Sequence, residues 1–269
     1  MPKLLLPLLA LTLALSASAQ TEPFAFVVLA DPHLREDRPG EPTGVDKFLE
    51  VLAQIRALPQ QPDFILMLGD THPEKLAPLL PQIGLPVHVV AGNHETVAHR
   101  QQLRALFPGD FGDRDFYAFT HKGCRFIGLC TALVGDHVGH FESQDITPPV
   151  GQVEFLKDEL ATHRDLPRFI FAHVPPEPQN RPHSSHLGSL ESAWFHDLVR
   201  AEKPTACFFG HRHYRYEYDC GGTPILFVPS TNWNSGAHKR GFYLATMADS
   251  KCTLTFHETP PASPGGAEL

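Results

Sequence analysis

Short apolar runs rich in Val, Ile and Phe are the feature that most constrains the fold of this chain. Runs of this kind, each a few residues long, predict strands that are buried on both faces of a sheet. They lie at 24–30, 63–68, 86–91, 168–172 and 205–209. Apolar residues with helical spacing occur between several of them, over 45–58 and again over 153–160. This alternation predicts βαβ units, with helices packed outside a central sheet.

Two predicted hairpins extend this pattern. The stretch FYAFTHKGCRFIGLC has a turn signal at Lys122-Gly123, and the stretch YRYEYDCGGTPILFV has one at Gly221-Gly222. The chain has 269 residues, of which 42% are hydrophobic, and it contains no internal repeat, so it can bury one large core. We therefore predict one α/β domain in which two packed sheets are flanked by helices.

The N-terminal segment predicts export. Lys3 is followed by an apolar run over 4–15, and the small residues Ala17 and Ala19 suit cleavage near Ala19. A membrane anchor is the alternative, but the run is shorter than the roughly 20 residues that span a bilayer. We therefore predict a signal peptide over 1–19, a secreted or periplasmic protein, and a mature chain with no membrane span.

The rest of the chain is acidic. Removal of 1–19 takes only Lys3 from the 22 basic residues and none from the 30 acidic residues, which leaves a net charge of -9. This balance argues against binding to a nucleic-acid backbone, so we predict no stable nucleic-acid complex. An anionic substrate would need a local source of positive charge, which bound metal ions can supply. The folded domain is predicted over 20–259, and the Pro- and Gly-rich tail over 260–269 is predicted to be disordered.

Five cysteines leave the disulfide pattern open. An exported protein permits disulfides, and the odd number leaves at least one thiol unpaired. Cys124 and Cys130 share one face of a predicted strand and are too far apart to bridge each other. Cys207 begins an apolar run and is predicted to be a buried thiol. The pair to test first is Cys220 with Cys252, which lie on two late predicted strands.

Polar side chains follow each of the five apolar runs. The carboxyl ends of strands in an open α/β sheet form binding sites, so these side chains should converge. They are Asp31 and His33, Asp70, Asn93, His173, and His211 with His213. Alone, Asp70 is better explained as a turn former or helix cap, and a His-x-His pair as part of a polar loop. Five such groups in succession favour a metal site, since imidazole and carboxylate together suit zinc, iron or manganese.

Taken together, these motifs resemble the calcineurin-like metallophosphoesterases, whose pattern is D-x-H, G-D, G-N-H-E/D, a later His and G-H-x-H. All five motifs appear here in that order from Asp31 to His213, and the family fold would extend over about 24–257. The resemblance implies a four-layer αββα sandwich, with two mixed sheets flanked by helices, and a centre of two metal ions. The motif style is nearest to the bacterial cyclic-nucleotide phosphodiesterase branch.

The resemblance also implies a role for each residue. Two divalent or trivalent ions of manganese, iron or zinc would be bridged by Asp70. The first ion would be held by Asp31, His33 and His213. The second ion would be held by Asn93, His173 and His211. Such a centre hydrolyses phosphomonoesters or phosphodiesters by a metal-bridged hydroxide, and His94 is implied as the acid that protonates the leaving oxygen.

The sequence departs from the family pattern at Pro73. Related phosphoesterases often have Asp or Asn at this position, three residues after the bridging carboxylate, and some use it to orient the acid histidine. Glu95 and Glu74 are the candidates to orient His94 in its place. Pro73 also excludes the tyrosine that purple acid phosphatases carry at this position.

Substrate choice is left open between small phosphomonoesters and small phosphodiesters. The segments 134–145 and 174–189 are predicted to frame the entrance of the site. Candidate substrate-binding residues are Arg35, Arg212, His183 and His186. The same two segments also contain His137, His140 and Arg181, and solvated loop residues are the alternative interpretation for most of them.

A non-catalytic metal-binding or ligand-binding protein on the same scaffold is the competing interpretation, because a fold does not guarantee an activity. The complete set of seven predicted ligands, together with His94, favours the enzyme. A binding protein has no need of an acid beside the metal ligands.

Overall fold

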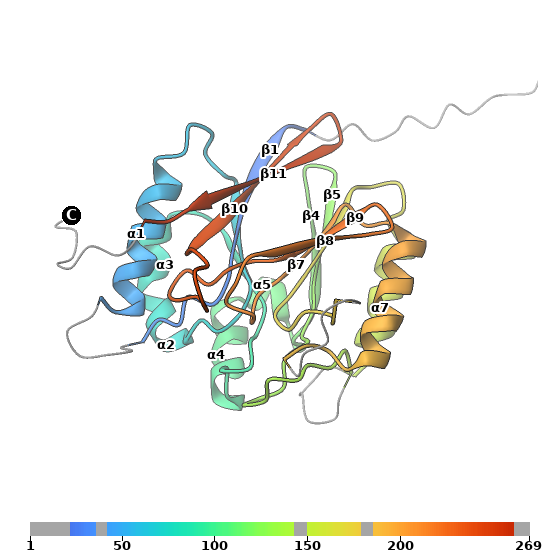
Figure 1. Cartoon of the computed structure of the whole chain (residues 1–269), viewed down its shortest axis with the longest axis horizontal. Helices are drawn as coiled ribbons and strands as arrows, with labels where there is room; N and C mark the ends of the chain where they lie inside the picture. The colour runs from blue at the N-terminus through green and yellow to red at the C-terminus, as the bar shows by residue number, and fades with distance from the viewer. Residues whose placement is uncertain (1–21, 36–41, 143–149, 179–184, 261–269) are drawn as a thin grey trace, which may run out of the picture.

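The computed structural model of the chain describes residues 22–35, 42–142, 150–178 and 185–260. Two mixed sheets form its centre and lie between layers of helices (Figure 1). This is the predicted four-layer αββα sandwich. The predicted signal peptide and the tail beyond Pro260 lie outside the described residues. None of the helices that the structure describes combines the length and the hydrophobicity needed to cross a membrane.

The five-stranded sheet contains the first three predicted apolar runs. Its strands are β1 (Phe24–Leu29), β2 (Phe64–Met67), β3 (Val87–Val89), β10 (Gly241–Ala248) and β11 (Lys251–Glu258). Their order is β11-β10-β1-β2-β3, with β1, β2 and β3 parallel and with β10 and β11 antiparallel. All residues of the three parallel strands are buried except His88, as predicted for strands covered on both faces.

The six-stranded sheet contains both predicted hairpins. Its strands are β4 (Tyr117–His121), β5 (Cys124–Gly128), β6 (Arg168–Ala172), β7 (Ala206–Phe209), β8 (Tyr216–Cys220) and β9 (Thr223–Phe227). Their order is β4-β5-β6-β7-β9-β8, with antiparallel strands at the two edges. The hairpin turns Lys122-Gly123 and Gly221-Gly222 are confirmed, and all four turn residues have the positive φ that such tight turns require.

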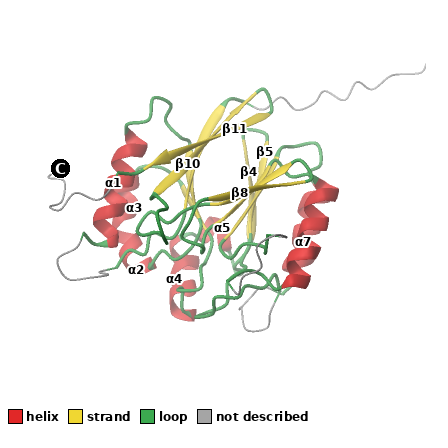
Figure 2. Ribbon diagram, viewed as in Figure 1, coloured by secondary structure: helices red, strands yellow, loops and turns green. Residues whose placement is uncertain are grey.

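Helices cover the outer faces of both sheets, and in Figure 1 α1 and α3 lie at one side of the molecule and α7 at the other (Figure 1, Figure 2). The helices are α1 (Gly44–Arg56), α2 (Pro73–Leu76), η1 (Ala77–Leu79), α3 (Leu80–Ile83), α4 (Val97–Leu106), α5 (Pro108–Phe111), α6 (Gln152–Thr162) and α7 (Ser189–Glu202). Helix α1 begins at a capping box, in which Thr43 Oγ1 accepts the Asp46 N–H and the Asp46 carboxylate accepts the Thr43 N–H.

Phenylalanine rings fill the space between the two sheets. The ring centroid of Phe26 in β1 lies 5.2 Å from that of Phe126 in β5 and 5.3 Å from that of Phe169 in β6. Phe64 in β2 lies 5.2 Å from Phe126. A second apolar cluster packs the six-stranded sheet against α6 and α7. These contacts fix the strands of both sheets relative to one another, and with them the loops at the strand ends.

The predicted disulfide between Cys220 and Cys252 is wrong. Cys220 lies in β8 at the edge of the six-stranded sheet, whereas Cys252 lies in β11 at the edge of the five-stranded sheet. All five cysteines are free, and Cys207 is buried as predicted. The error arose because the sequence indicates that both cysteines lie on strands but does not indicate which sheet each strand joins.

Candidate metal centre

The loops that follow β1, β2, β3, β6 and β7 converge. They carry Asp31 and His33, Asp70, Asn93, His173, and His211 with His213. Ten non-glycine residues of the described chain have positive φ, and six of them lie in these loops. Such conformations are costly for residues with a Cβ atom and tend to cluster at functional sites, where the surrounding structure holds them in place.

Two glycines let the loops approach one another closely. A Cβ atom on Gly92 would collide with the Asp70 carboxylate. A Cβ atom on Gly69, whose φ is +85°, would lie 2.6 Å from His173 Nδ1. Glycine is therefore needed directly before Asp70 and directly before Asn93, which gives a physical reason for the G-D and G-N-H sequences.

Asp31, His33, Asp70 and His213 form one buried group of potential metal ligands. Each offers one ligand atom, and the four atoms lie within 4.8 Å of one another. His33 Nε2 and His213 Nε2 are 3.1 Å apart. Asp31 Oδ1 is buried and has no hydrogen-bond partner among the described residues. Two imidazoles and two carboxylates that face one small volume fit a metal cation, which would also satisfy this oxygen.

A second group adjoins the first. Asn93 Oδ1 lies 3.0 Å from His173 Nε2 and 3.1 Å from His211 Nδ1. Asp70 lies between the two groups, because its Oδ2 is 3.5 Å from His33 Nε2 on one side and 3.5 Å from His173 Nε2 on the other. The structure thus brings all seven predicted ligand residues together.

Backbone carbonyls orient the imidazoles of both groups. Three rings each donate one N–H to a carbonyl oxygen: His173 to Leu68 at 2.6 Å, His211 to His137 at 3.0 Å and His213 to Trp233 at 2.9 Å. When such a ring is neutral, its other nitrogen carries a lone pair directed toward the centre. Hydrogen bonds of this kind are the usual support of a histidine that ligates a metal.

Burial governs the protonation of the centre. It raises the pKa of the Asp70 carboxyl to about 7 and lowers the pKa of the His33 imidazole to about 2. Burial alone would also raise the pKa of Asp31, but the charge of His213 helps to bring it below its ordinary value. His33 is therefore a neutral ligand, and a bound cation would keep both carboxylates ionised.

His94, the predicted acid, lies at the edge of the centre. Its ring centroid is 5.1 Å from that of His33, and its Nε2 is 3.9 Å from Asp70 Oδ2. Its backbone N–H donates to Asp70 Oδ1 at 3.0 Å, and its side chain is 39% exposed. Burial lowers the pKa of His94, and the positive charge of Arg35 lowers it further.

Glu95 and Glu74 are both engaged elsewhere. The carboxylate of Glu95 accepts the backbone N–H groups of Asp70, Thr71, His72 and Gly92. Glu74 lies 3.9 Å from His72 Nδ1 and 3.5 Å from His99 Nε2. The carboxylate beside His94 Nε2 is instead that of Asp70, 3.9 Å away, so neither candidate glutamate is shown to orient His94.

Sequence reasoning missed the buried support behind the centre. Glu95 is fully buried, and Arg100 of α4 is 3% exposed. The guanidinium of Arg100 donates to the carbonyl oxygens of Gly92, Glu95 and Ala132. Glu95 thus holds the loops after β2 and β3 against each other, and Arg100 ties the loop after β3 to the segment after β5. The sequence contained one indication that Arg100 is buried, because Arg100 lies three residues before Leu103 and therefore on the same face of α4.

The loop after β9 was missed as well. Ser230 Oγ donates to the Asp31 carbonyl at 2.7 Å, and Asn232 Nδ2 donates to the His33 carbonyl at 3.1 Å. The Trp233 carbonyl accepts from His213 Nδ1. The signal was the polar run STNWNS, which directly follows the apolar run PILFVP, as the other site loops follow theirs.

The candidate substrate-binding residues are scattered. Arg35 is exposed and adjoins the centre, since its charge adds to the effect of burial in lowering the pKa of His94. Arg212 points elsewhere: its guanidinium lies over the Tyr214 ring, 5.2 Å from the centroid. His186 is only 2% exposed. His183 and Arg181 lie outside the described residues.

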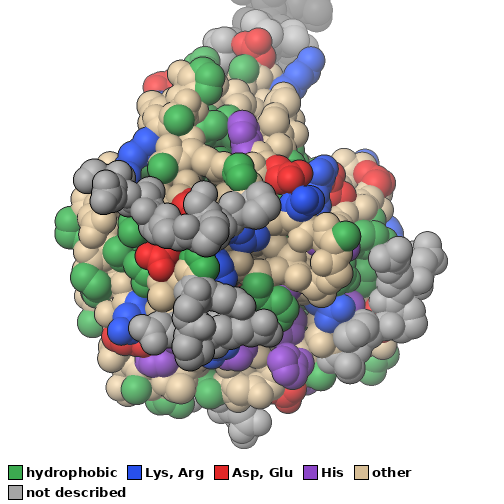
Figure 3. Space-filling model, turned by 60° about the vertical axis from the view of Figure 1, so that its left-hand side comes forward, with side chains coloured by type: hydrophobic (Ala, Val, Ile, Leu, Met, Phe, Trp, Pro, Cys, Tyr) green, Lys and Arg blue, Asp and Glu red, His purple; other side chains and the backbone are tan. Residues whose placement is uncertain are grey.

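The segment around His137 lies against the second ligand group. His137 is exposed, its ring centroid is 5.8 Å from that of His211, and Gly135 N–H donates to the Asn93 carbonyl at 2.7 Å. His140 is turned toward Glu191, 3.1 Å away. Figure 3 shows histidine side chains gathered along the lower part of one face of the molecule, near Lys and Arg side chains.

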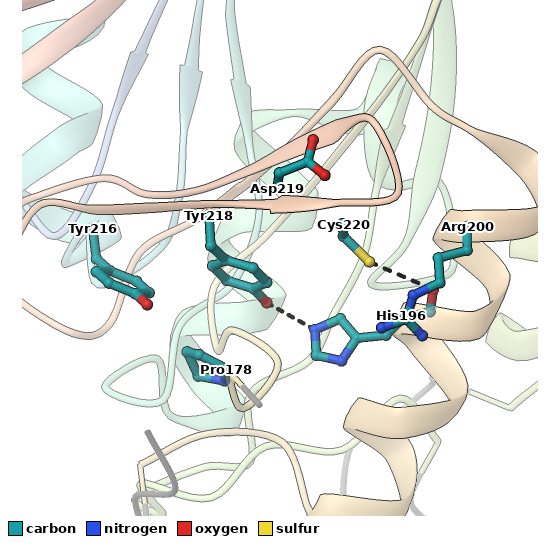
Figure 4. A pocket seen from close by; sticks show the side chains of 7 residues that line it. All are labelled: Pro178, His196, Arg200, Tyr216, Tyr218, Asp219 and Cys220. Atoms are coloured by element: carbon teal, nitrogen blue, oxygen red, sulfur yellow. Dashed lines mark hydrogen bonds between the residues drawn. The ribbon is translucent and has the colours of Figure 1, made fainter. Parts of the chain in front are cut away.

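A separate cavity of about 140 Å³ lies between β8 and α7. Figure 4 shows Tyr218 Oη directed toward His196 Nε2, 2.8 Å away, and Cys220 Sγ directed toward the His196 carbonyl. The other lining residues described are Pro178, Arg200, Tyr216 and Asp219. None of these residues belongs to the two ligand groups, so this cavity is distinct from the centre.

Comparisons with known proteins give one matching family model and solved structures with a similar fold. A family model described as calcineurin-like phosphoesterase matches residues 24–215. No curated protein matches the chain. A dimetal phosphatase from Danio rerio has a similar structure, with a TM-score of 0.68 and 18% identity over 89% of this chain and 98% of its own. GAP50, the anchor in the inner membrane complex of Plasmodium, gives a TM-score of 0.60 and 13% identity over 90% of this chain and 87% of its own.

Proposed function

Because this chain belongs to the calcineurin-like phosphoesterase family, we propose that it hydrolyses small phosphomonoesters or phosphodiesters at a centre of two metal ions. The position of Asp70 carries the proposal, since its Oδ2 lies 3.5 Å from an imidazole nitrogen of each ligand group. A carboxylate in that position can serve two ions at once. The family and the buried Asp/His cluster suggest divalent metal ions, and manganese, iron or zinc would suit these ligands.

We assign each ligand to one of the two ions by the distances between the side chains. One ion would be held by Asp31, His33 and His213. The other would be held by Asn93, His173 and His211. Asp70 would be shared. When bound, the ions would neutralise charge on the phosphate oxygens and lower the pKa of a water molecule toward neutrality.

The remaining chemistry belongs to side chains at the edge of the centre. His94 Nε2 would donate a proton to the departing oxygen, because the imidazole is partly exposed and lies beside His33. Arg35 would bind the anionic substrate, because its guanidinium carries a fixed positive charge next to His94. The carbonyl-bound imidazoles of the ligands would keep their orientation through the reaction.

A non-catalytic metal-binding protein is the second candidate. GAP50, which has a similar fold, is described as an anchor, and a fold by itself does not guarantee an activity. The partly exposed imidazole of His94 favours the enzyme, since a purely structural metal site would be closed on all sides.

Metal analysis followed by an ester panel tests the proposed function. The purified protein should contain about two transition-metal ions per chain and hydrolyse nitrophenyl monoesters or diesters. Chelation should abolish hydrolysis, and manganese, zinc or iron should restore it. Bound metal without hydrolysis of any ester would favour the non-catalytic candidate, and full activity in metal-free protein would contradict both.

Export is part of the same proposal. The apolar run over 4–15 and the small residues before Gln20 support removal of 1–19. When the whole chain is expressed in a secreting host, N-terminal sequencing of the exported protein should give Gln20 or a close neighbour. Recovery of Met1 from the periplasm or the medium would contradict this.

A further inference from the structure

Trp233 presents a large apolar surface beside the metal centre. Its side chain is 48% exposed, and it is the one aromatic residue among the exposed large hydrophobic side chains of the described chain. The indole centroid lies 4.0 Å from that of His213 and 6.5 Å from that of His33. The indole therefore lies next to the two imidazoles of the first ligand group.

Hydrogen bonds hold Trp233 in this position. Its backbone N–H donates to Ser230 Oγ at 3.2 Å, and its backbone carbonyl accepts from His213 Nδ1 at 2.9 Å. Ser230 is itself tied to the Asp31 carbonyl, and Asn234 binds both the N–H and the carbonyl of Ser230. The loop is thus fixed to the ligand residues, and a ligand that stacks on the indole would not have to order it.

Support of His213 does not account for the exposed part of the indole. The hydrogen bond to His213 uses the backbone carbonyl of residue 233, which any amino acid would supply. Packing on His213 uses only part of the ring, and nearly half of the side chain remains in water. An exposed indole that packs on a ligand histidine and lies in a loop tied to the centre is suited to stack on a planar ring.

We propose that Trp233 is a stacking platform that selects phosphoesters whose organic group carries a planar aromatic ring, such as aryl or nucleoside esters. This proposal rests on the proposed function, because the metal centre would hold the phosphate while the ring lies on the indole. Trp233 would then touch the substrate directly and would discriminate between aromatic and aliphatic esters.

Fluorescence tests the contact without catalysis. The chain has two tryptophans, and Trp194 lies in α7, packed against Phe141 at 5.1 Å between ring centroids. Trp194→Phe leaves Trp233 as the sole indole, and Trp233→Phe is the matched control. The zinc-loaded proteins are titrated with phenylphosphonate and methylphosphonate, which resist hydrolysis. Phenylphosphonate should change the emission of Trp194→Phe but not that of Trp233→Phe, and methylphosphonate should change neither. An equal response of Trp194→Phe to both phosphonates would overturn the proposal.

Kinetics test the selection. Trp233→Ala should raise KM for phenyl phosphate about 5- to 150-fold, the range expected when one stacked ring is lost, and leave KM for methyl phosphate nearly unchanged. Trp233→Phe should retain most of the preference. An equal loss on both esters, or a fall in metal content in both variants, would show that Trp233 is structural.

The two proposals fail in different ways. If the unsubstituted protein hydrolyses no ester but phenylphosphonate still changes the Trp233 emission, the proposed function is wrong and the platform stands. If the protein hydrolyses esters without any difference between the Trp233 variants, the hydrolase stands and the platform is wrong.

Discussion

Asp70 is the side chain on which both ligand groups depend. It is 1% exposed, and its carboxylate faces His33 on one side and His173 on the other. Asp70→Ala should therefore lower the metal content from about two ions to less than one per chain, because both sites lose the same ligand. Metal content is measured after dialysis. Asp197→Ala, at a position of α7 where the side chain is 79% exposed, is the control and should keep its metal. Two ions retained by Asp70→Ala would contradict the shared-ligand assignment.

His94 makes a prediction that depends on the leaving group. A nitrophenolate departs readily, whereas an alkoxide needs a proton, and general acid catalysis contributes about 10²- to 10⁴-fold. His94→Ala should thus slow alkyl esters by about that factor, slow nitrophenyl esters far less, and leave the metal content unchanged. Comparison of kcat for the two esters checks this. Glu74→Gln is the control, because Glu74 faces His72 and His99. An equal loss on both esters would point to a positioning role for His94.

At this scale the sequence shows which residues lie in the loops of the centre, but it does not show where their side chains point. The sequence named Arg35 and Arg212 as candidate substrate-binding residues, and each lies in a loop that follows a strand near the centre. The direction of each guanidinium depends on distant neighbours, and Arg212 packs on Tyr214. The role of Glu95 was hidden for the same reason, because its partners are backbone N–H groups brought near by the fold.

At the scale of elements, Glu95 joins the loop after β2 to the loop after β3. Its carboxylate accepts the N–H groups of Asp70, Thr71, His72 and Gly92. In Glu95→Gln, the amide NH₂ replaces one acceptor oxygen and leaves buried donors unpaired, which should lower the free energy of unfolding by about 3 kcal/mol. Urea denaturation of the metal-free proteins measures this independently of ion binding. Glu142→Gln, at an exposed site, should show little change, and equal stability of the two variants would contradict the assigned role.

The buried cysteines lead to a prediction about the number and reactivity of free thiols. All five thiols are free, and burial raises the pKa of Cys124 and of Cys252 to about 12. Thiolates are therefore rare in the folded protein, and a thiol reagent at pH 8 should react slowly. In urea without a reductant the same reagent should titrate five thiols per chain. A count of three would mean that one disulfide exists.

Elements were predictable wherever the pattern is local. The buried strands, the helix over Gly44–Arg56 and the two glycine turns follow from periodicity and turn chemistry over a few residues. The pairing of β8 with β9 was equally local, because one short turn joins them. The sheet that contains β11 was not predictable, since β11 pairs with β10 and through it with β1, more than 200 residues away.

At the scale of the whole molecule, the centre joins the two sheets. Asp31, Asp70 and Asn93 follow strands of the five-stranded sheet, whereas His173 and His211 follow strands of the six-stranded sheet. Cations bound between them would link the sheets at one end, beyond the phenylalanine core. The convergence was predictable, because every parallel strand delivers its polar residue at its carboxyl end.

Metal binding should therefore stabilise the entire fold. An ion that binds the folded chain alone, at about 100 times its Kd, adds about 2.7 kcal/mol to the free energy of unfolding. For a chain of this size that corresponds to a rise in Tm of about 5 to 10 °C. Calorimetry of the chelated and the zinc-loaded protein measures the rise, and Asp70→Ala, which lacks the shared ligand, should show little of it. If zinc raised the Tm of Asp70→Ala as much as that of the unsubstituted protein, the stabilising ions would be bound elsewhere. The centre between the sheets would then not be the metal site.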